Sequence, residues 1–109
     1  MSPESFERGA LTEAVYYILL SVIAPMHGYA IMQNIEKQTA GRVALGPGTL
    51  YGAINALVQK NWITAHSGVQ DSRKKEYVIT DLGRNMLQME LKRLKELLRN
   101  GEAFVGDMQ

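Results

Sequence analysis

The sequence of 109 residues contains no cysteine, and none of its apolar runs is long enough to cross a membrane. Without cysteine the chain can form no disulfide, no thiolate nucleophile and no zinc site built on thiolates, which is compatible with a reducing cytoplasm. The longest apolar run lies within residues 14–25, far short of the roughly 20 residues that span a bilayer. The acidic N-terminus lacks the pattern of a signal peptide. These absences predict a cytoplasmic protein with no membrane partner.

Residues that carry catalysis or bind metals are also scarce. The two histidines, His27 and His66, fall in separate predicted elements, and they do not have the spacing of a metal site. Paired carboxylates and a nucleophile elbow are missing, and the turn at Gly46-Pro47-Gly48 lacks the lysine of a phosphate-binding loop. The sequence therefore predicts a protein that is not an enzyme and that uses no metal and no cofactor.

Charge is unevenly distributed along the chain, although the net charge is only +1. Residues 37–75 contain six basic residues and one acidic residue, whereas the rest of the chain contains six basic and ten acidic residues. This pattern fits a surface that faces a polyanion, and chance clustering on a solvated face would produce it too. With 46% hydrophobic residues, the chain can fill one compact core.

The spacing of apolar residues predicts three helices in the first part of the chain. The first covers residues 9–23, has a broad apolar face and ends at Pro25, after which residues 25–28 form a turn. The second covers residues 29–38, stops at Gly41, and packs through Tyr29, Ile31, Met32 and Ile35. The third begins next to Pro47 and runs to about Lys60, with Asn61 in the left-handed conformation.

Two strands and a long helix complete the predicted fold. The strands cover residues 62–66 and 73–79, and in the second strand Tyr77 and Ile79 share one face. Thr80 caps a last helix over residues 81–100, which Gly101 ends. The order predicts a mainly α fold with a small β-hairpin, namely a winged helix-turn-helix with a C-terminal dimerisation helix. We expect the DNA-binding part over residues 1–79 and the dimerisation helix with its tail over residues 80–109.

The third helix has one apolar side and one side without bulky groups. Its buried stripe is predicted to consist of Leu50, Ile54, Leu57 and Val58, and the opposite side carries Gly48, Gly52, Asn55 and Gln59, flanked by Thr49 and Tyr51. A helix this slim could enter the major groove of DNA, where amides read base edges and hydroxyls bind phosphate. A glycine inside a helix costs about 1 kcal/mol relative to alanine. We therefore expect close packing or a closely approaching ligand at Gly52.

A basic triplet, Arg73-Lys74-Lys75, stands at the start of the second strand. Next to a groove-reading helix, it suits contact with flanking phosphates. A solubilising role is the alternative, because lysine side chains usually remain in solvent.

Several short motifs resemble those of the PadR family of bacterial transcriptional regulators. They are His27-Gly28-Tyr29, Gly46-Pro47-Gly48-Thr49-Leu50-Tyr51, Arg73-Lys74-Lys75-Glu76-Tyr77 and Ile79-Thr80-Asp81-Leu82-Gly83. The single last helix is similar to the small subfamily. The resemblance implies a homodimeric repressor of detoxification, efflux or stress genes that an apolar ligand releases. It also implies that Thr49 and Tyr51 bind DNA in the major groove and that Arg73 and Lys74 contact the DNA backbone.

The last helix carries a wide apolar stripe that predicts a partner chain. Leucines recur at spacings of four, three and four, with further apolar residues beside them (Leu82, Met86, Met89 and Leu97). The predicted dimerisation residues are Leu11, Val15, Ile18, Leu87, Leu91, Leu94 and Leu98. Met86 and Met89 could line a pocket for a small apolar effector or simply fill the core.

These observations predict a sequence-specific regulator of transcription that binds double-stranded DNA as a homodimer at a pseudo-palindromic operator. The predicted DNA-binding residues are Tyr29, Gln33, Lys37, Gly48, Thr49, Tyr51, Gly52, Asn55, Arg73, Lys74 and Lys75. A winged-helix module that binds proteins and not DNA is the alternative, and it would expose apolar residues on the third helix. An activator or ligand sensor on the same scaffold also fits the sequence.

Overall fold

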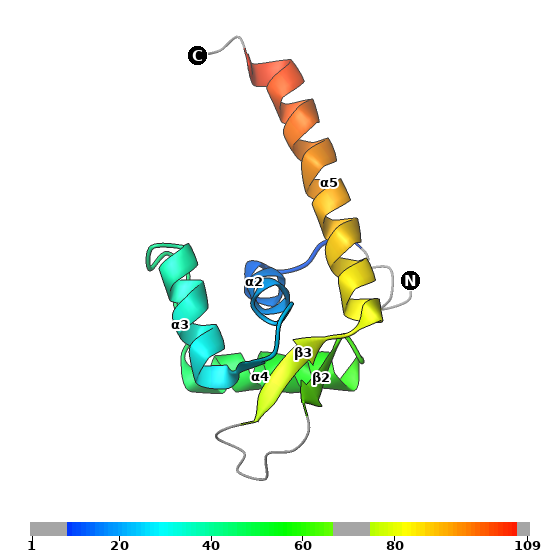
Figure 1. The fold of residues 1–109 in the computed structure, drawn as a ribbon. Helices are drawn as coiled ribbons and strands as arrows, with labels where there is room; N and C mark the ends of the chain where they lie inside the picture. The colour runs from blue at the N-terminus through cyan, green and yellow to red at the C-terminus, as the bar shows by residue number, and fades with distance from the viewer. Residues whose placement is uncertain (1–8, 67–74, 107–109) are drawn as a thin grey trace.

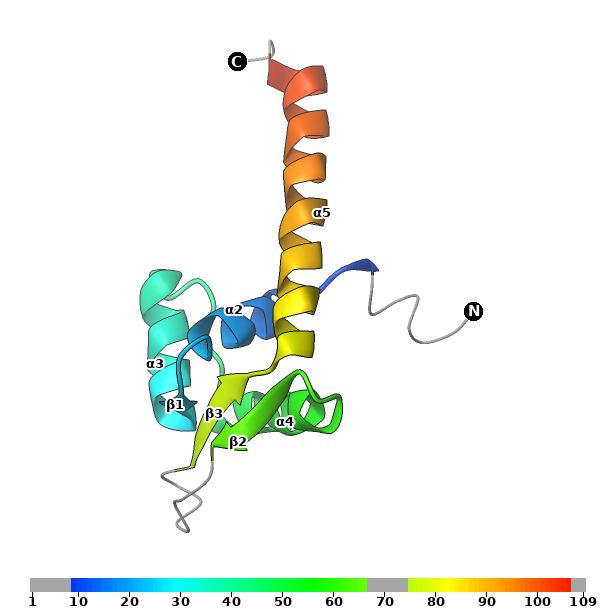
Figure 2. The same ribbon diagram turned by 45° about the vertical axis from the view of Figure 1, so that its right-hand side comes forward.

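The computed structural model describes residues 9–66 and 75–106, in which three helices and a small sheet form a body from which a long helix projects (Figure 1). In chain order the elements are α2 (Glu13–Ser21), β1 (Met26–His27), α3 (Gly28–Gln38), α4 (Pro47–Gln59), β2 (Ile63–His66), β3 (Glu76–Ile79) and α5 (Asp81–Val105). Both ribbon views place α2 between α3 and α5, and α4 at the end of the molecule away from the tip of α5 (Figures 1 and 2). None of the helices described is long and apolar enough to cross a membrane.

The sheet has three antiparallel strands in the order β1–β3–β2. Strands β2 and β3 form the predicted hairpin, with Ile63 opposite Ile79. The prediction of a turn over residues 25–28 is wrong, because Met26 and His27 pair with Tyr77 and Glu76 of β3. This two-residue strand is too short to leave an alternating pattern in the sequence. It brings the start of α3 next to the hairpin.

Helix α2 is shorter at both ends than the predicted helix over residues 9–23. It begins after Thr12, whose side chain accepts a hydrogen bond from the Val15 N–H at 3.2 Å. It ends before Val22, whose carbonyl accepts a hydrogen bond from the Ile79 N–H at 2.8 Å. The chain therefore leaves the helix at the point where it meets β3, three residues before Pro25.

Helix α3 starts one residue earlier than predicted because His27 caps it. The His27 Nδ1 atom accepts a hydrogen bond from the Ala30 N–H at 3.2 Å. Ile31 and Ile35 are fully buried, as expected, but Tyr29 is 57% exposed, so its predicted packing role is wrong. After the helix, Ala40 and Gly41 adopt left-handed φ angles of 52° and 80°, which confirms the predicted stop.

Helices α4 and α5 begin as the sequence predicts, but α5 ends later. Pro47 lies in the first turn of α4, Asn61 adopts a φ of 64°, and the Thr80 side chain caps α5 by accepting from the Gly83 N–H at 3.0 Å. The prediction that Gly101 ends the last helix is wrong, since α5 continues to Val105. A glycine in an exposed helix costs only about 1 kcal/mol, which the flanking turns of a long helix can offset.

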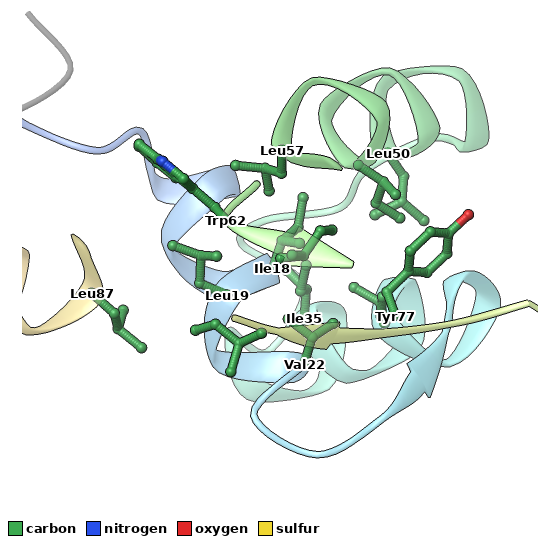
Figure 3. Packing of buried hydrophobic residues seen from close by; sticks show 13 residues of the cluster. Ile18, Leu19, Val22, Ile35, Leu50, Leu57, Trp62, Tyr77 and Leu87 are labelled. Atoms are coloured by element: carbon green, nitrogen blue, oxygen red, sulfur yellow. The ribbon is translucent and has the colours of Figure 1, made fainter. Parts of the chain in front are cut away.

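The core forms where α2, α3, α4 and the sheet meet (Figure 3). Its buried members are Ile18, Leu19, Val22, Ile31, Ile35, Leu50, Ile54, Leu57, Trp62, Ile63, Tyr77, Ile79 and Leu87. The predicted stripe of α4 is confirmed for three residues, whereas Val58 is only half-buried. Tyr77 and Ile79 share the inner face of β3, as expected.

Two residues predicted to contact a partner chain belong to this core instead. Ile18 is 0% exposed and Leu87 is 6% exposed within a single chain. The chain itself therefore already covers both side chains, and they expose little or no surface to a second copy. Apolar periodicity identifies the buried face of a helix but does not say whether the same chain or a partner covers it.

The start of α5 is fixed tightly to the end of α4. The Trp62 carbonyl accepts hydrogen bonds from the Thr80 N–H and the Thr80 hydroxyl, both at 3.0 Å. Gly83 packs against the same carbonyl, and a Cβ added there would also lie 2.8 Å from Cγ1 of Ile79. This joint sets the direction in which α5 leaves the body.

The first half of α5 contains a buried acid, which lines a groove together with residues at the N-terminal end of α2. Glu90 is only 6% exposed, and Arg93 donates to its two carboxylate oxygens at 2.8 and 2.6 Å. The Arg93 guanidinium lowers the pKa of Glu90, and the Leu11 N–H adds to this effect, although burial opposes it.

We predict that Glu90→Gln lowers the free energy of unfolding by about 1–2 kcal/mol at pH 7, because a charged acceptor is lost in a buried site. Since the pKa of Glu90 is lowered in the folded state, its contribution is present above the unfolded value of about 4.3 and is lost as pH falls further. Urea unfolding at pH 7 and below pH 4 checks this. The two proteins should converge in acid, and a constant difference across this range would contradict the assignment.

Candidate nucleic-acid interface

The outer face of α4 consists of small and polar groups. Gly48, Thr49, Gly52, Asn55 and Gln59 are all exposed, as the sequence predicted. Among the described residues of α4, Tyr51 is the only large hydrophobic residue in the exposed class, at 36%. The buried side of the same helix holds Leu50, Ile54 and Leu57 against the core. The helix therefore lies on the body with its small and polar side outward.

The two glycines on this face are not required by packing within the chain. A Cβ added at Gly48 or Gly52 would meet no atom within 4 Å, and neither residue has a positive φ. One expected reason for glycine at position 52 is close packing, and within a single chain this expectation is wrong. The other expected reason, a partner that approaches the backbone of α4 more closely than a side chain would allow, stays a prediction, and toleration of glycine on an exposed polar surface is the alternative.

Tyr51 lies across the first turn of α3. A Cβ added at Gly28 would lie 2.6 Å from Cζ and 2.7 Å from Cε1 of Tyr51. Tyr77 of β3 is close by, since burial raises its pKa and the Tyr51 phenol adds to the shift. The ring therefore packs against the first turn of α3, while part of it faces solvent.

Helix α3 adds a second row of exposed side chains to the candidate interface. Tyr29, Gln33 and Lys37 are spaced by four residues, so they lie on one side of the helix, and all three are exposed. Gln33 and Lys37 border an open groove of about 530 Å³ that Glu36, Ala40 and Gly41 complete. The structure thus brings these predicted DNA-binding residues to the surface.

The basic residues of the middle segment do not all belong to one surface. Arg42 donates to both carboxylate oxygens of Glu13 in α2, at 3.0 and 2.6 Å, which the sequence did not suggest. This pair lowers the pKa of Glu13, and because both side chains are more than half exposed, it adds little stability. The Lys60 ammonium lies 5.0 Å from the centre of the Trp62 ring. Charge counting along the sequence therefore overstated the basic surface.

The structure describes only one residue of the basic triplet Arg73-Lys74-Lys75. Lys75 is half-buried and precedes β3, so the predicted second strand over residues 73–79 starts later, at Glu76. Arg73 and Lys74 lie outside the described residues.

The exposed apolar groups gather on the second half of α5. Its buried residues end at Glu90, and the exposed large hydrophobic residues beyond it are Leu91, Leu94, Leu97, Leu98, Phe104 and Val105. Both ribbon views show this part of α5 clear of the body (Figures 1 and 2). Leu11 and Val15 of the predicted dimer set are half-buried and pack against the core.

The two methionines of the predicted ligand pocket do not lie together in one hollow. Met86 packs against the core, whereas Met89 is 47% exposed and borders an open groove of about 360 Å³ with charged neighbours (Lys92, Arg93, Glu96 and Arg99). A groove of about 280 Å³ between α2 and α5 is lined by Leu11, Glu13, Tyr16, Tyr17, Glu90, Arg93 and Leu94. Aromatic and charged groups meet in this groove.

Comparison with known proteins identifies a family. The model of the transcriptional regulator PadR-like family matches residues 18–89. A protein of 37.1 kDa in transposon Tn4556 of Streptomyces fradiae, described as uncharacterized, is 36% identical over 80 residues. These cover 73% of this chain but only 21% of that protein, so the chain spans about a fifth of the relative's length.

Solved structures of transcriptional regulators share the fold. A transcriptional regulator from Clostridium thermocellum has a TM-score of 0.69 at 22% identity, covering 85% of this chain and 92% of its own. A PadR family transcriptional regulator from Eggerthella lenta has a TM-score of 0.68 at 20% identity, covering 97% and 89%. The predicted winged-helix fold class is thereby confirmed. Members of the matched family are regulators and not enzymes, which agrees with the prediction from the sequence. The chain belongs to the PadR-like family of transcriptional regulators.

Proposed function

We propose that this chain is a homodimeric repressor of transcription that inserts α4 into the major groove of a pseudo-palindromic DNA operator. The observation that carries the proposal is the outer face of α4, where Gly48 and Gly52 have open space around them and the exposed groups, apart from Tyr51, are small or polar. A major groove about 12 Å wide admits a helix of this kind. Asn55 and Gln59 then face base edges, and Thr49 and Tyr51 reach phosphate oxygens.

The second row of contacts comes from α3 and the start of β3. Tyr29, Gln33 and Lys37 are exposed on one side of α3, which suits a helix that crosses the DNA backbone beside the groove-reading helix. Lys75, with Arg73 and Lys74, completes the set on the wing side. These contacts hold the protein in register and add the salt dependence of binding.

The distribution of apolar surface favours DNA over a protein as the partner of α4. A module that binds proteins through this helix needs exposed aliphatic or aromatic anchors in the contact. On α4 the only described large hydrophobic residue in the exposed class is Tyr51, which carries a polar hydroxyl, whereas exposed apolar groups gather on α5, at Leu97, Leu98 and Phe104 among others. We therefore assign α4 to DNA and the second half of α5 to a second copy of the chain.

The partner surface on α5 follows from its leucines. Leu91, Leu94 and Leu98 recur at three and four residues and are 38%, 37% and 62% exposed. Helix α5 has 25 residues, which corresponds to roughly 37 Å, so two copies can pair along the half that leaves the body. Pairing about a two-fold axis presents two α4 helices to two half-sites about one DNA turn apart.

We predict that Leu98→Glu raises the dimer dissociation constant at least about ten-fold, because a carboxylate would be buried without a partner in the apolar contact. Analytical ultracentrifugation of both proteins over a concentration series measures this. Arg99→Glu is the matched control, since it adds the same group one residue further on, to the side of the stripe. Equal dimerisation of the wild type and Leu98→Glu would contradict the assignment of this surface.

The regulated genes and the releasing ligand form the finer part of the proposal. We infer that an apolar ligand with a polar end binds the groove between α2 and α5, where Tyr16, Tyr17 and Arg93 lie together. In a dimer this groove adjoins the α5 pair, so a ligand there would change the separation of the α4 helices. Genes for detoxification, efflux or stress response are the expected targets.

Selection of DNA fragments by the purified full chain, at two salt concentrations, tests the proposal. The expected result is a pseudo-palindromic site whose affinity falls steeply as salt rises, since each neutralised phosphate releases condensed counterions. Failure to enrich any sequence at low salt would contradict it and would favour a protein partner for α4.

A further inference from the structure

The side chain of Tyr51 is fixed by an unusual contact with another helix. Its ring occupies the place that a side chain on Gly28 would take, with Cζ and Cε1 at 2.6 and 2.7 Å from an added Cβ. Gly28 itself is buried, and it is the first residue of α3. The ring of the groove-reading helix thus rests on the backbone of the preceding helix.

Nothing in the backbone of α3 requires glycine at this position. Gly28 does not have a positive φ, which alone would exclude other residues. Alanine is the better helix former, so a glycine here weakens the start of α3. The three atoms nearest to an added Cβ all belong to the Tyr51 ring and its hydroxyl. The absence of a side chain therefore serves the ring and not the fold of α3.

The first turn of α3, on which the Tyr51 ring rests, is itself held in place. His27 caps α3 through its Nδ1 atom, and it also pairs with Glu76 of β3, so the first turn of α3 cannot move independently of the sheet. Tyr77 of β3 is 7% exposed, and burial raises its pKa, with a smaller contribution from the Tyr51 phenol. In Figure 3 the Tyr77 ring stands at the edge of the core with its hydroxyl pointing away from the cluster. The cap and the strand pairing therefore fix the position of Gly28, against which the Tyr51 ring packs.

We infer that Gly28 is a positioning residue for DNA binding: by having no side chain, it lets the Tyr51 ring lie across the first turn of α3, where the hydroxyl is held ready for a DNA phosphate. The inference rests on the proposed function of α4. Its physical benefit is preorganisation, because a side chain already fixed in the free protein loses less freedom on binding. A ring displaced from Gly28 would have to be ordered again each time the protein meets DNA.

A double-mutant cycle on the full chain tests this inference, with a DNA fragment selected by the wild type as the probe. Gly28→Ala is expected to weaken binding about three- to ten-fold, and Tyr51→Ala to weaken it at least as much. In the Tyr51→Ala background, adding Gly28→Ala should change affinity less than two-fold, because the ring that the methyl group displaces is absent. Equal losses from Gly28→Ala in both backgrounds would overturn the inference.

A spectroscopic measurement separates positioning from a general loss of structure. Protein labelled with 3-fluorotyrosine gives a fluorine resonance for each tyrosine, and Tyr51→Phe identifies that of Tyr51. Gly28→Ala should shift the Tyr51 resonance in the absence of DNA while leaving Tyr16 and Tyr17, which lie on α2, unchanged. An unshifted Tyr51 resonance would show that the ring does not depend on Gly28.

The remaining outcomes are also decisive. If Gly28→Ala fails to fold even together with Tyr51→Ala, something other than the ring requires glycine, and the inference is wrong. If the wild type binds DNA, Tyr51→Ala weakens binding and Gly28→Ala does not, the inference fails while the proposed function stands. If the wild type selects no DNA at all, the proposed function fails first, and the inference fails with it.

Discussion

Gly52→Leu is expected to lower the affinity for the operator at least about a hundred-fold while making the protein more stable. Gly52 is exposed in the middle of the outer face of α4, and a Cβ added there would meet no atom within 4 Å. Leucine improves the helix by roughly 0.8 kcal/mol, so the fold gains. Its side chain would stand between the α4 backbone and the base edges and would separate donors from acceptors over much of the contact, a loss of about 2.7 kcal/mol or more.

The opposite signs of the two effects make this prediction specific. Thermal unfolding at fixed protein concentration measures stability, and fluorescence anisotropy with a labelled operator measures affinity. Asn85→Leu is the matched control, because it adds the same side chain at an exposed position of α5 that helical spacing places away from the leucine stripe. It should leave affinity within two-fold of the wild type. If Gly52→Leu binds DNA as well as Asn85→Leu does, α4 is not the groove-reading helix.

Gly83→Ala is expected to lower the free energy of unfolding by about 3 kcal/mol, with a fall in Tm of roughly 10–20 °C. An added methyl group would overlap the Trp62 carbonyl oxygen and would lie 2.8 Å from Cγ1 of Ile79. The carbonyl cannot move away cheaply, since it accepts the hydrogen bonds of the Thr80 N–H and hydroxyl at 3.0 Å. The methyl group would therefore disrupt the contacts of the Trp62 carbonyl with Thr80 and Gly83, which fix the start of α5.

Gly101→Ala is the control for this prediction. It is the same substitution in the same helix, but a Cβ at Gly101 meets nothing within 4 Å. It should raise stability by up to about 1 kcal/mol, because alanine is the better helix former. Urea unfolding at one protein concentration compares the two variants. Equal stability of Gly83→Ala and Gly101→Ala would show that the contact with Trp62 does not hold α5 in place.

The residues on the outer face of α4 could be predicted from the sequence, because the spacing of apolar residues within the helix alone determines which side is exposed. The buried positions Leu50, Ile54 and Leu57 fix the rotation of the helix, and the exposed positions follow from it. Local signals also identified the start of α5 at Thr80 and the left-handed residue Asn61. Each of these features involves residues within one or two turns of each other.

Features that depend on contacts between distant residues could not be predicted in this way. Strand β1 is formed by pairing with β3, about fifty residues further along the chain. Ile18 and Leu87 belong to apolar stripes that look the same whether the chain itself or a partner covers them. Arg42 was counted with the basic residues because its partner Glu13 lies 29 residues away. The role of Gly28 is visible only when the Tyr51 ring is placed against it, although both residues stand in the motifs that indicated the family.

DNA cleavage from a single labelled position tests the placement of α4 most directly. Since the chain contains no cysteine, Asn55→Cys can be coupled with an iron chelate at one site only, and Arg99→Cys on the distal part of α5 provides the control. With the operator bound, the label at position 55 is predicted to cut DNA within two half-sites about 10 base pairs apart, and the label at position 99 is predicted to cut weakly or not at all. Strong cleavage from position 99, or none from position 55 while the protein remains bound, would contradict the account.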